Sequence, residues 1–125
     1  MEDKIKQVIV MRRDLKMRRG KEIAQGSHAS MAFLTRRLQE HITPVWTKAE
    51  LDWLEGSFAK VCVRANSEEE LLDIYEKAKE AGLEVHLITD SGRTEFHGVP
   101  TNTCLAIGPD HSSKIDPITG ELTLL

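Results

Sequence analysis

Apolar and polar positions along the chain follow two spacings, which predict alternating strands and helices. Continuous apolar runs such as Val8-Ile9-Val10-Met11 are typical of strands buried on both faces. Other segments repeat apolar residues every three or four positions, as amphipathic helices do. Strands are predicted over 4–11, 58–65, 83–89 and 103–107, and helices over 20–38, from Thr47 through Leu54, and over 68–81.

The first predicted helix has one apolar face, which we expect to pack against the sheet. Arg36 and Arg37 lie away from that face. Its expected members are Ile23, Ser27, Met31, Leu34 and Leu38.

Local signals mark the ends of the later helices. Thr47-Lys48-Ala49-Glu50 is a capping box, in which the threonine and the glutamate each satisfy a backbone N–H group. Ser67 precedes three glutamates and predicts an N-cap, and Gly82 is placed to end the same helix. The tail contains a predicted turn at 117–120 and a short closing extension.

The order of elements predicts the topology of the sheet. Strand–helix–strand–helix–strand implies right-handed crossovers, and therefore three parallel strands with helices on the faces of the sheet. The helix-free link to the fourth strand favours an antiparallel return. We therefore predict an α/β fold, one domain over residues 1–125, with a four-stranded mixed sheet. The ends of the first three strands, near Arg12, Asn66 and Asp90, then share one edge with the start of the fourth at Thr103.

Charge is divided unevenly along a chain whose formal net charge is −3. Residues 1–40 contain ten Lys/Arg and five Asp/Glu, whereas residues 41–125 contain seven and fifteen. A polyanion would be attracted to the first segment and repelled by the second, which favours one docking orientation. A solvated basic face on an acidic protein is the alternative, and charge alone does not separate the two.

Composition and motifs argue against several classes of protein. The chain has no apolar run of membrane length and no apolar signal-peptide region, so we expect a cytoplasmic protein with no membrane partner. It has no P-loop, GxGxxG or GxSxG, and its five histidines lack metal-ligand spacing, so neither a cofactor nor a metal is expected. Cys62 and Cys104 are predicted to be buried free thiols. No aromatic residue lies in the basic stretch, which favours phosphate contacts over base stacking.

The turn from the first strand into the first helix concentrates positive charge. Between Arg12 and Lys21 there are six basic residues and one acid, Asp14. Lys21 lies in the first helical turn, where free N–H groups and the helix dipole already attract anions. A lysine there costs helix stability, which makes sense if an anion or a developing negative charge is bound. Gln25 and His28 continue the same stripe of the helix, and solvated basic side chains are again the alternative.

The segment 89–103 forms a second polar cluster. Asp90 follows a strand and is itself followed by a turn at Gly92, a cation at Arg93 and a hydroxyl at Thr94. Asp90 could orient a water, a ribose hydroxyl or Lys21. From this segment alone, an Asx turn that caps the loop is the better supported interpretation.

Three stretches resemble the peptidyl-tRNA hydrolases of the second type. They are VIVMRRDLKMRRGKEIAQGSHASM, ITDSGRTE, and TNTCLAIGP with KIDPITGELTLL, and together they extend over essentially the whole chain. The resemblance implies a three-layer α/β/α domain on a four-stranded mixed sheet. It also implies hydrolysis of the ester that joins a stalled peptide to the 3′ ribose of tRNA. Members of the family are often dimeric, so the resemblance allows for a homodimer.

The same resemblance assigns roles to residues of this chain. The lysine and histidine of the family's first motif fall on Lys21 and His28, and the acid and threonine of the second fall on Asp90 and Thr94. A threonine before the last strand falls on Thr103, which with Thr94 would hold water or the ribose. Lys21 would stabilise a phosphate or the oxyanion, and Asp90, or else His28, would activate water without a metal. Contacts to tRNA are expected from Arg12, Arg18, Arg19, Gln25 and Arg93.

Two functions from other classes remain as alternatives. The basic turn Arg12–Lys21 could serve a non-catalytic RNA-binding or ribosome-associated adaptor. The charge division could instead serve a protein-interaction module with an acidic partner. An adaptor would show no turnover, and an interaction module would show no salt-dependent binding of tRNA.

Overall fold

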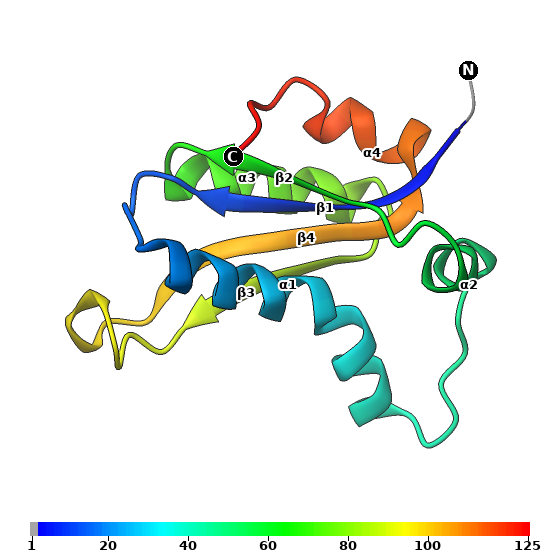
Figure 1. Cartoon of the computed structure of the whole chain (residues 1–125), viewed down its shortest axis with the longest axis horizontal. Coiled ribbons are helices and arrows are strands. Elements are labelled where there is room, and N and C mark those ends of the chain that lie inside the picture. The colour runs from blue at the N-terminus through cyan, green and yellow to red at the C-terminus, as the bar shows by residue number, and fades with distance from the viewer. Residues whose placement is uncertain (1–2) are drawn as a thin grey trace.

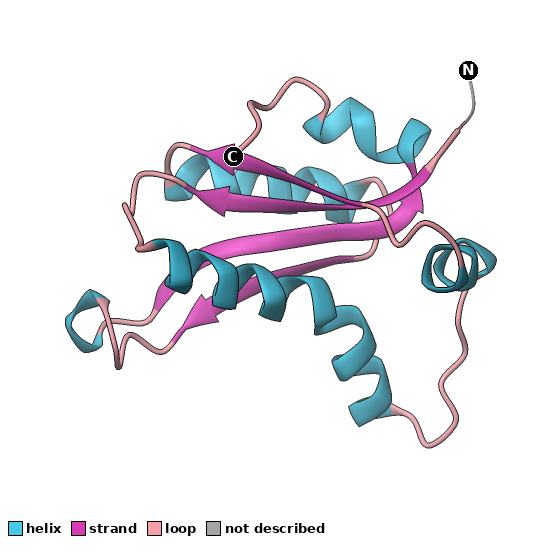
Figure 2. Ribbon diagram, in the orientation of Figure 1, coloured by secondary structure: helices cyan, strands magenta, loops and turns pink. Residues whose placement is uncertain are grey.

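Four strands form one mixed sheet in the order β2-β1-β4-β3 (Figures 1 and 2). The computed structural model describes residues 3–125. β1 (Ile5–Arg12) pairs in parallel with β2 (Lys60–Ala65), and β4 (Thr101–His111) pairs antiparallel with both β1 and β3 (Val85–Asp90). The predicted four-stranded mixed sheet is confirmed. The prediction of three parallel strands is wrong, because β1 and β2 form the one parallel pair in the described part of the chain.

β4 lies between β1 and β3 because it is the strand best suited to the centre of the sheet. It has 11 residues, and those from Thr103 to Pro109 are all buried. Crossover rules constrain the direction of a strand but leave its neighbours undetermined. Since β1 and β3 both run antiparallel to β4, their carboxyl ends still meet at the same edge.

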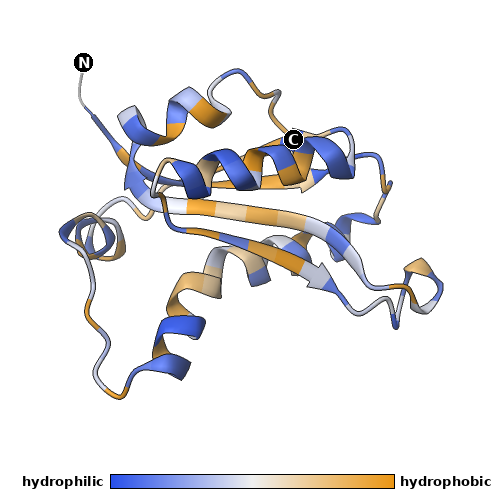
Figure 3. Ribbon diagram, turned by 180° about the vertical axis from the view of Figure 1, so that it is seen from behind, coloured by the Kyte–Doolittle hydropathy of each residue, from blue (hydrophilic) through white to orange (hydrophobic). Residues whose placement is uncertain are grey.

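Helices cover both faces of the sheet (Figures 1 and 3). α1 (Arg19–Glu40) lies on one face, while α3 (Glu68–Glu80) and α4 (Ser112–Thr119) lie on the other. α2 (Lys48–Glu55) packs at the end of the sheet, where the ring of Trp53 lies 5.9 Å from that of Phe33 in α1. Among the helices formed by residues 3–125, none is both long and apolar enough to cross a membrane.

The predicted helix ends are confirmed where local signals were strong. Thr47 and Glu50 form the reciprocal capping box, with N···O distances of 2.8 and 3.1 Å. The Ser67 hydroxyl accepts a hydrogen bond from the backbone N–H of Glu70 at 3.1 Å. Gly82 has a φ of +74°, the left-handed conformation that glycine adopts without strain at the end of a helix. Each of these helix ends is determined by residues within a few positions of it, so the sequence alone is enough to predict them.

The face that α1 turns to the sheet differs from the predicted one. Ile23, Met31 and Leu38 are 63%, 54% and 58% exposed. The small side chains of buried alanines let the helix approach the strands closely, and a buried glutamine is tolerated because it is hydrogen-bonded. The buried residues of α1 are Gln25, Ala29, Ala32 and Phe33.

The C-terminal region also departs from prediction. β4 is longer than expected, and α4 occupies most of the segment where a turn was predicted. Asp3 caps α4 from the other end of the chain, accepting hydrogen bonds from the N–H and hydroxyl of Ser113 at 2.9 and 2.8 Å. The predicted closing extension is confirmed, since Leu124 bridges to Val63 of β2. Cys104 is buried as predicted, but Cys62 is exposed.

Candidate active site

The functional side chains predicted from the sequence gather at one edge of the sheet. β1 and β3 end at this edge, at Arg12 and Asp90, and β4 begins there at Thr101. Asp90 is the register partner of Thr101, and Met11 is that of Cys104. α1 starts beside the same edge after a short turn from β1 (Figure 1). The common edge predicted from topology is therefore confirmed.

Lys21 and Asp90 meet across this edge. The Lys21 ammonium donates hydrogen bonds to Asp90 Oδ1 at 2.9 Å and to Thr94 Oγ1 at 3.0 Å. The side chains of Lys21 and Asp90 are 14% and 12% exposed, so the ion pair is shielded but can be reached from solvent. The predicted meeting of the cationic turn with the Asp90 loop is confirmed.

Both oxygens of Asp90 accept hydrogen bonds. Oδ1 also accepts from Gln25 Nε2 at 3.2 Å, and Oδ2 accepts from the N–H of Gly92 at 2.8 Å. The second bond is the Asx turn, so one carboxylate both caps the loop and holds the lysine. The hydrogen bond from Lys21 is the main cause that lowers the pKa of Asp90; Gly92, the lysine's charge and Gln25 add to it, and partial burial opposes them. The carboxylate therefore stays ionised at neutral pH.

Behind Asp90, buried hydrogen bonds fix the amide of Gln25. The Thr103 hydroxyl donates to Gln25 Oε1 at 2.6 Å, and the Cys104 thiol donates to the Gln25 carbonyl oxygen at 3.3 Å. Burial raises the pKa of Cys104 to about 12, so this thiol keeps its proton. The hydrogen bond from Thr103 directs Gln25 Oε1 toward β4, which leaves Gln25 Nε2 to donate to Asp90.

This placement does not support two sequence predictions. Thr103 was expected to hold water or the ribose, but it is 0% exposed and reaches the site only through Gln25. Gln25 was expected to contact tRNA, but it is 3% exposed and both ends of its amide bond to the protein. Both residues support Asp90 from behind, a role that spacing along one helix or one strand does not reveal.

The loop between β3 and β4 places an aromatic ring beside Lys21. The Lys21 ammonium lies 5.9 Å from the ring centre of Phe96, at the start of the short helix η1 (Phe96–Gly98). The ring packs against the core cluster under α1, and Phe96 has a φ of 65°. Phe96 could not be predicted from the sequence, because a single aromatic residue in a polar loop belongs to no periodic pattern.

Gly92 and Gly98 provide a matched test of how tightly this loop is closed. A Cβ at Gly92 would clash with the carbonyl oxygen of Val99, whereas one at Gly98 would meet no heavy atom within 4 Å. Both glycines have positive φ, +83° and +77°, so alanine costs about 1–2 kcal/mol at either position. We expect Gly92→Ala to lose about 1–3 kcal/mol more than Gly98→Ala, because a clash with backbone adds strain. Urea unfolding measures both variants, and equal losses would contradict the close approach.

The basic residues predicted to contact tRNA divide into exposed and buried ones. Arg18 and Arg19 at the start of α1 are exposed, as is Arg93 in the loop. Arg12 is 8% exposed; it binds Asp14 at 2.7 Å and donates to a backbone carbonyl of β4 at 3.0 Å. This burial does not support the predicted contact of Arg12 with tRNA, and the guanidinium instead ties the end of β1 to β4.

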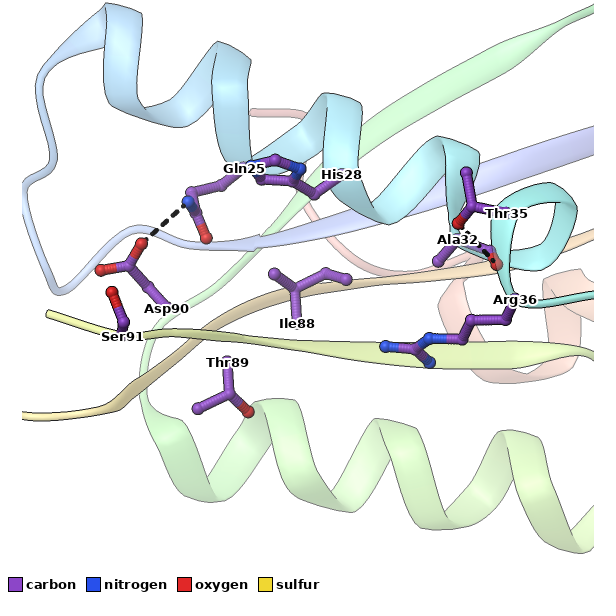
Figure 4. A pocket seen from close by; sticks show the side chains of 9 residues that line it. All are labelled: Gln25, His28, Ala32, Thr35, Arg36, Ile88, Thr89, Asp90 and Ser91. Atoms are coloured by element: carbon purple, nitrogen blue, oxygen red, sulfur yellow. Dashed lines mark hydrogen bonds between the residues drawn. The ribbon is translucent and has the colours of Figure 1, made fainter. Parts of the chain in front are cut away.

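A cleft of about 420 Å³ runs from Asp90 between α1 and β3 (Figure 4). His28 is exposed and lines this cleft. The residues that line the cleft are Gln25, His28, Ala32, Thr35 and Arg36 from α1, Ile88, Thr89 and Asp90 from β3, and Ser91 directly after β3. Over residues 3–125, no three His, Cys, Asp or Glu side chains are grouped so that they could hold a metal ion.

Comparison with known proteins places this chain in a family. A solved structure of a protein of unknown function from Agrobacterium tumefaciens shares the fold, with a TM-score of 0.62 and 14% identity over 100% of this chain and 99% of that one. The peptidyl-tRNA hydrolase of Methanothermobacter thermautotrophicus is 48% identical over 97% of this chain and 100% of its own length. The protein of the same name from Methanocaldococcus jannaschii is 44% identical over 97% and 100%, respectively. The family model described as peptidyl-tRNA hydrolase PTH2 matches residues 5–125. The chain therefore belongs to the PTH2 family of peptidyl-tRNA hydrolases.

Proposed function

We propose that this chain hydrolyses the ester between a peptide and the 3′ ribose of tRNA, with the reacting bond beside Lys21, Asp90 and Thr94. The observation that carries the proposal is the Lys21 ammonium, shared between Asp90 and Thr94 at 2.9 and 3.0 Å beside a cleft. Family membership supports the same activity. An adaptor without catalysis would not need a shielded lysine–carboxylate pair, so the adaptor alternative is not favoured.

Exposed basic side chains support binding of the tRNA acceptor end. Arg18 and Arg19 are exposed at the start of α1, and the N-cap residue Arg18 makes no side-chain hydrogen bond to the first turn. The N–H groups of that turn are thus left for an anionic ligand. Arg93 adds a further exposed cation from the loop. Contacts of this kind hold the phosphate backbone without reading base sequence, which suits an enzyme that acts on many tRNAs.

Lys21 is positioned to stabilise the negative charge that forms during hydrolysis. Water attacks the ester carbonyl carbon, and the carbonyl oxygen becomes an oxyanion that a fixed ammonium stabilises. When this intermediate collapses, the bond from the acyl carbon to the ribose 3′ oxygen breaks, and the proton removed from the water is returned to that oxygen. The dipole of α1 acts in the same direction, since Lys21 lies in its first turn. Thr94 accepts a hydrogen bond from Lys21 and keeps its own O–H for the ribose or the water.

The hydrogen bonds around Asp90 favour a positioning role over that of general base. Its two oxygens accept three hydrogen bonds, and its pKa is lowered, so it accepts a further proton poorly. His28 lines the same cleft and is exposed, and imidazole groups are well suited to proton transfer near neutral pH. We therefore propose that His28 takes a proton from the attacking water and that Asp90 holds the Lys21 ammonium in place.

A homodimer and a cytoplasmic location are further parts of the proposal. Ile23 and Met31 on α1 and Phe58 before β2 are 63%, 54% and 48% exposed, and apolar surface of this kind is often covered in an assembly. Peptidyl-tRNA is formed during translation, which argues for the cytoplasm.

The decisive test uses tRNA charged with an N-acetylated amino acid, with free-amine aminoacyl-tRNA as the matched control. We expect the purified chain to release the acetylated amino acid, to spare the free-amine form, and to keep its rate in excess EDTA. Release is measured as acid-soluble label against time. Absence of turnover on the blocked substrate would refute the proposed function, and loss of turnover in EDTA would refute metal-independent hydrolysis.

A further inference from the structure

β3 has an edge that no other strand covers within residues 3–125. It pairs with β4 on one side, and α1 runs beside it on one face of the sheet (Figures 1 and 4). Figure 4 shows Ile88 and Asp90 on the α1 side of this strand and Thr89 on the other side. The edge of a strand presents N–H and C=O groups that an extended peptide can pair with.

The cleft between α1 and β3 connects this edge with the Asp90 carboxylate. It begins at Asp90, Ser91 and Gln25 and extends to Thr35 and Arg36 (Figure 4). From Gln25 to Arg36 the helix rises about 16 Å, at about 1.5 Å per residue. An extended chain crosses that distance with about four or five residues.

The direction of the cleft separates the two parts of the substrate. The ester joins tRNA on one side to the peptide on the other. Exposed Arg18 and Arg19 precede Lys21, whereas the cleft runs from the Lys21–Asp90 pair toward the C-terminal half of α1. When tRNA occupies the basic end, the cleft is left for the peptide.

The lining of the cleft suits a peptide backbone better than a nucleotide. Among the described residues that line it, none is Phe, Tyr or Trp, and Asp90 is the one acid. Of the planar groups on which an unpaired base could stack, His28 is assigned to proton transfer and Arg36 is hydrogen-bonded to β3, so neither offers a free stacking surface. Ala32, Thr35 and Ile88 are neutral and of small or medium size, so they impose little preference on peptide side chains.

We propose that the C-terminal residues of the peptide in peptidyl-tRNA lie in this cleft as an added strand on the outer edge of β3. The proposal rests on the proposed function and extends it to the peptide. Arg36 marks the far end of the site, because its Nη2 donates to the Leu87 carbonyl at 3.3 Å and its Nη1 lies 2.6 Å from His86 Nδ1. Main-chain pairing then binds the four or five residues next to the ester without regard to their sequence.

A series of substrates that differ only in peptide length tests the proposal. We would compare tRNA carrying N-acetylated alanine chains of one, two, four and eight residues. Each added hydrogen bond is worth about two- to tenfold, so kcat/KM should rise about tenfold or more up to four or five residues and then stay constant. A rate independent of length, with the one-residue substrate still hydrolysed, would overturn the added strand and leave the proposed function intact. No turnover of any member would refute the proposed function itself.

N-methylated peptides test the strand pairing directly. Alternate residues of a strand direct their N–H groups to opposite sides, so a methyl group on one residue blocks pairing and on the next residue does not. We compare substrates methylated at the second or at the third residue from the ester. One of the two methyl groups should lower kcat/KM about two- to tenfold, and the other should leave it unchanged. Equal effects at the two positions would overturn the pairing with β3.

Two tryptophan variants locate the site on α1. Thr35 and Gln39 are both exposed, but Gln39 lies one turn further along the helix and does not line the cleft. In Thr35→Trp the ratio of kcat/KM between the eight-residue and two-residue substrates should fall about two- to tenfold, because the far end of the site is blocked, while Gln39→Trp should keep it. An unchanged ratio in Thr35→Trp would overturn the proposal. Weaker inhibition of Thr35→Trp by the free trinucleotide CCA would also overturn it, since the cleft would then hold the 3′ end of tRNA.

Discussion

Replacing Lys21 by alanine is expected to lower kcat by about 10²–10³-fold, the usual effect of removing one donor to an oxyanion. The ammonium lies 2.9 Å from Asp90, so its loss leaves a carboxylate without a cation where negative charge develops. Affinity for tRNA should stay within a few-fold, because exposed Arg18 and Arg19 remain. Single-turnover hydrolysis of N-acetylaminoacyl-tRNA and filter binding of the same tRNA measure the two effects separately.

Arg19→Ala is the matched control, since it removes an exposed cation from the same helix. Here KM should rise and kcat should be kept, and the salt dependence of binding should weaken by about one phosphate contact. If Lys21→Ala instead raised KM and kept kcat, Lys21 would bind a tRNA phosphate and would not act on the oxyanion.

The meeting of Lys21 with Asp90 could be predicted because it follows from direction and order alone. Strands joined by right-handed crossovers run the same way, so the residues that follow them meet at one edge of the sheet. The position of this edge does not depend on which strand lies next to which. Lys21 and Asp90 therefore meet although the prediction of three parallel strands is wrong, since β4 lies between β1 and β3 without reversing the direction of either strand.

The hydrogen bonds that Gln25 makes behind the site could not be predicted, because they join residues that are distant in the sequence. An apolar pattern places Ile23 and Met31 inside and Gln25 outside, and the structure has the reverse. Gln25 is stable in the interior because Thr103 and Asp90, far away in sequence, satisfy its amide. The start of α4 likewise depends on Asp3, which lies more than a hundred residues earlier.

Replacing Asp90 by asparagine is expected to lower kcat about as strongly as Lys21→Ala, by about 10²–10³-fold. The amide has nearly the same shape and can still accept the hydrogen bond from Gly92, but it has no charge with which to hold the ammonium. Because the pKa of Asp90 is lowered, the wild-type carboxylate is ionised throughout the neutral range. The ratio of wild-type to variant kcat should therefore be constant from about pH 5 to pH 8, and pH–rate profiles of both proteins measure it.

The double variant decides whether Asp90 acts through Lys21. If its role is to position the ammonium, Asp90→Asn removes little from a protein that already lacks Lys21, since residues that act as a unit are strongly non-additive. The double variant should then retain about the kcat of Lys21→Ala. A combined loss near the product of the two single losses, about 10⁴–10⁶-fold, would show that Asp90 acts independently on the substrate or the water. Thermal unfolding separates this outcome from misfolding, because the loop cap from Gly92 remains in every variant and Tm should change little.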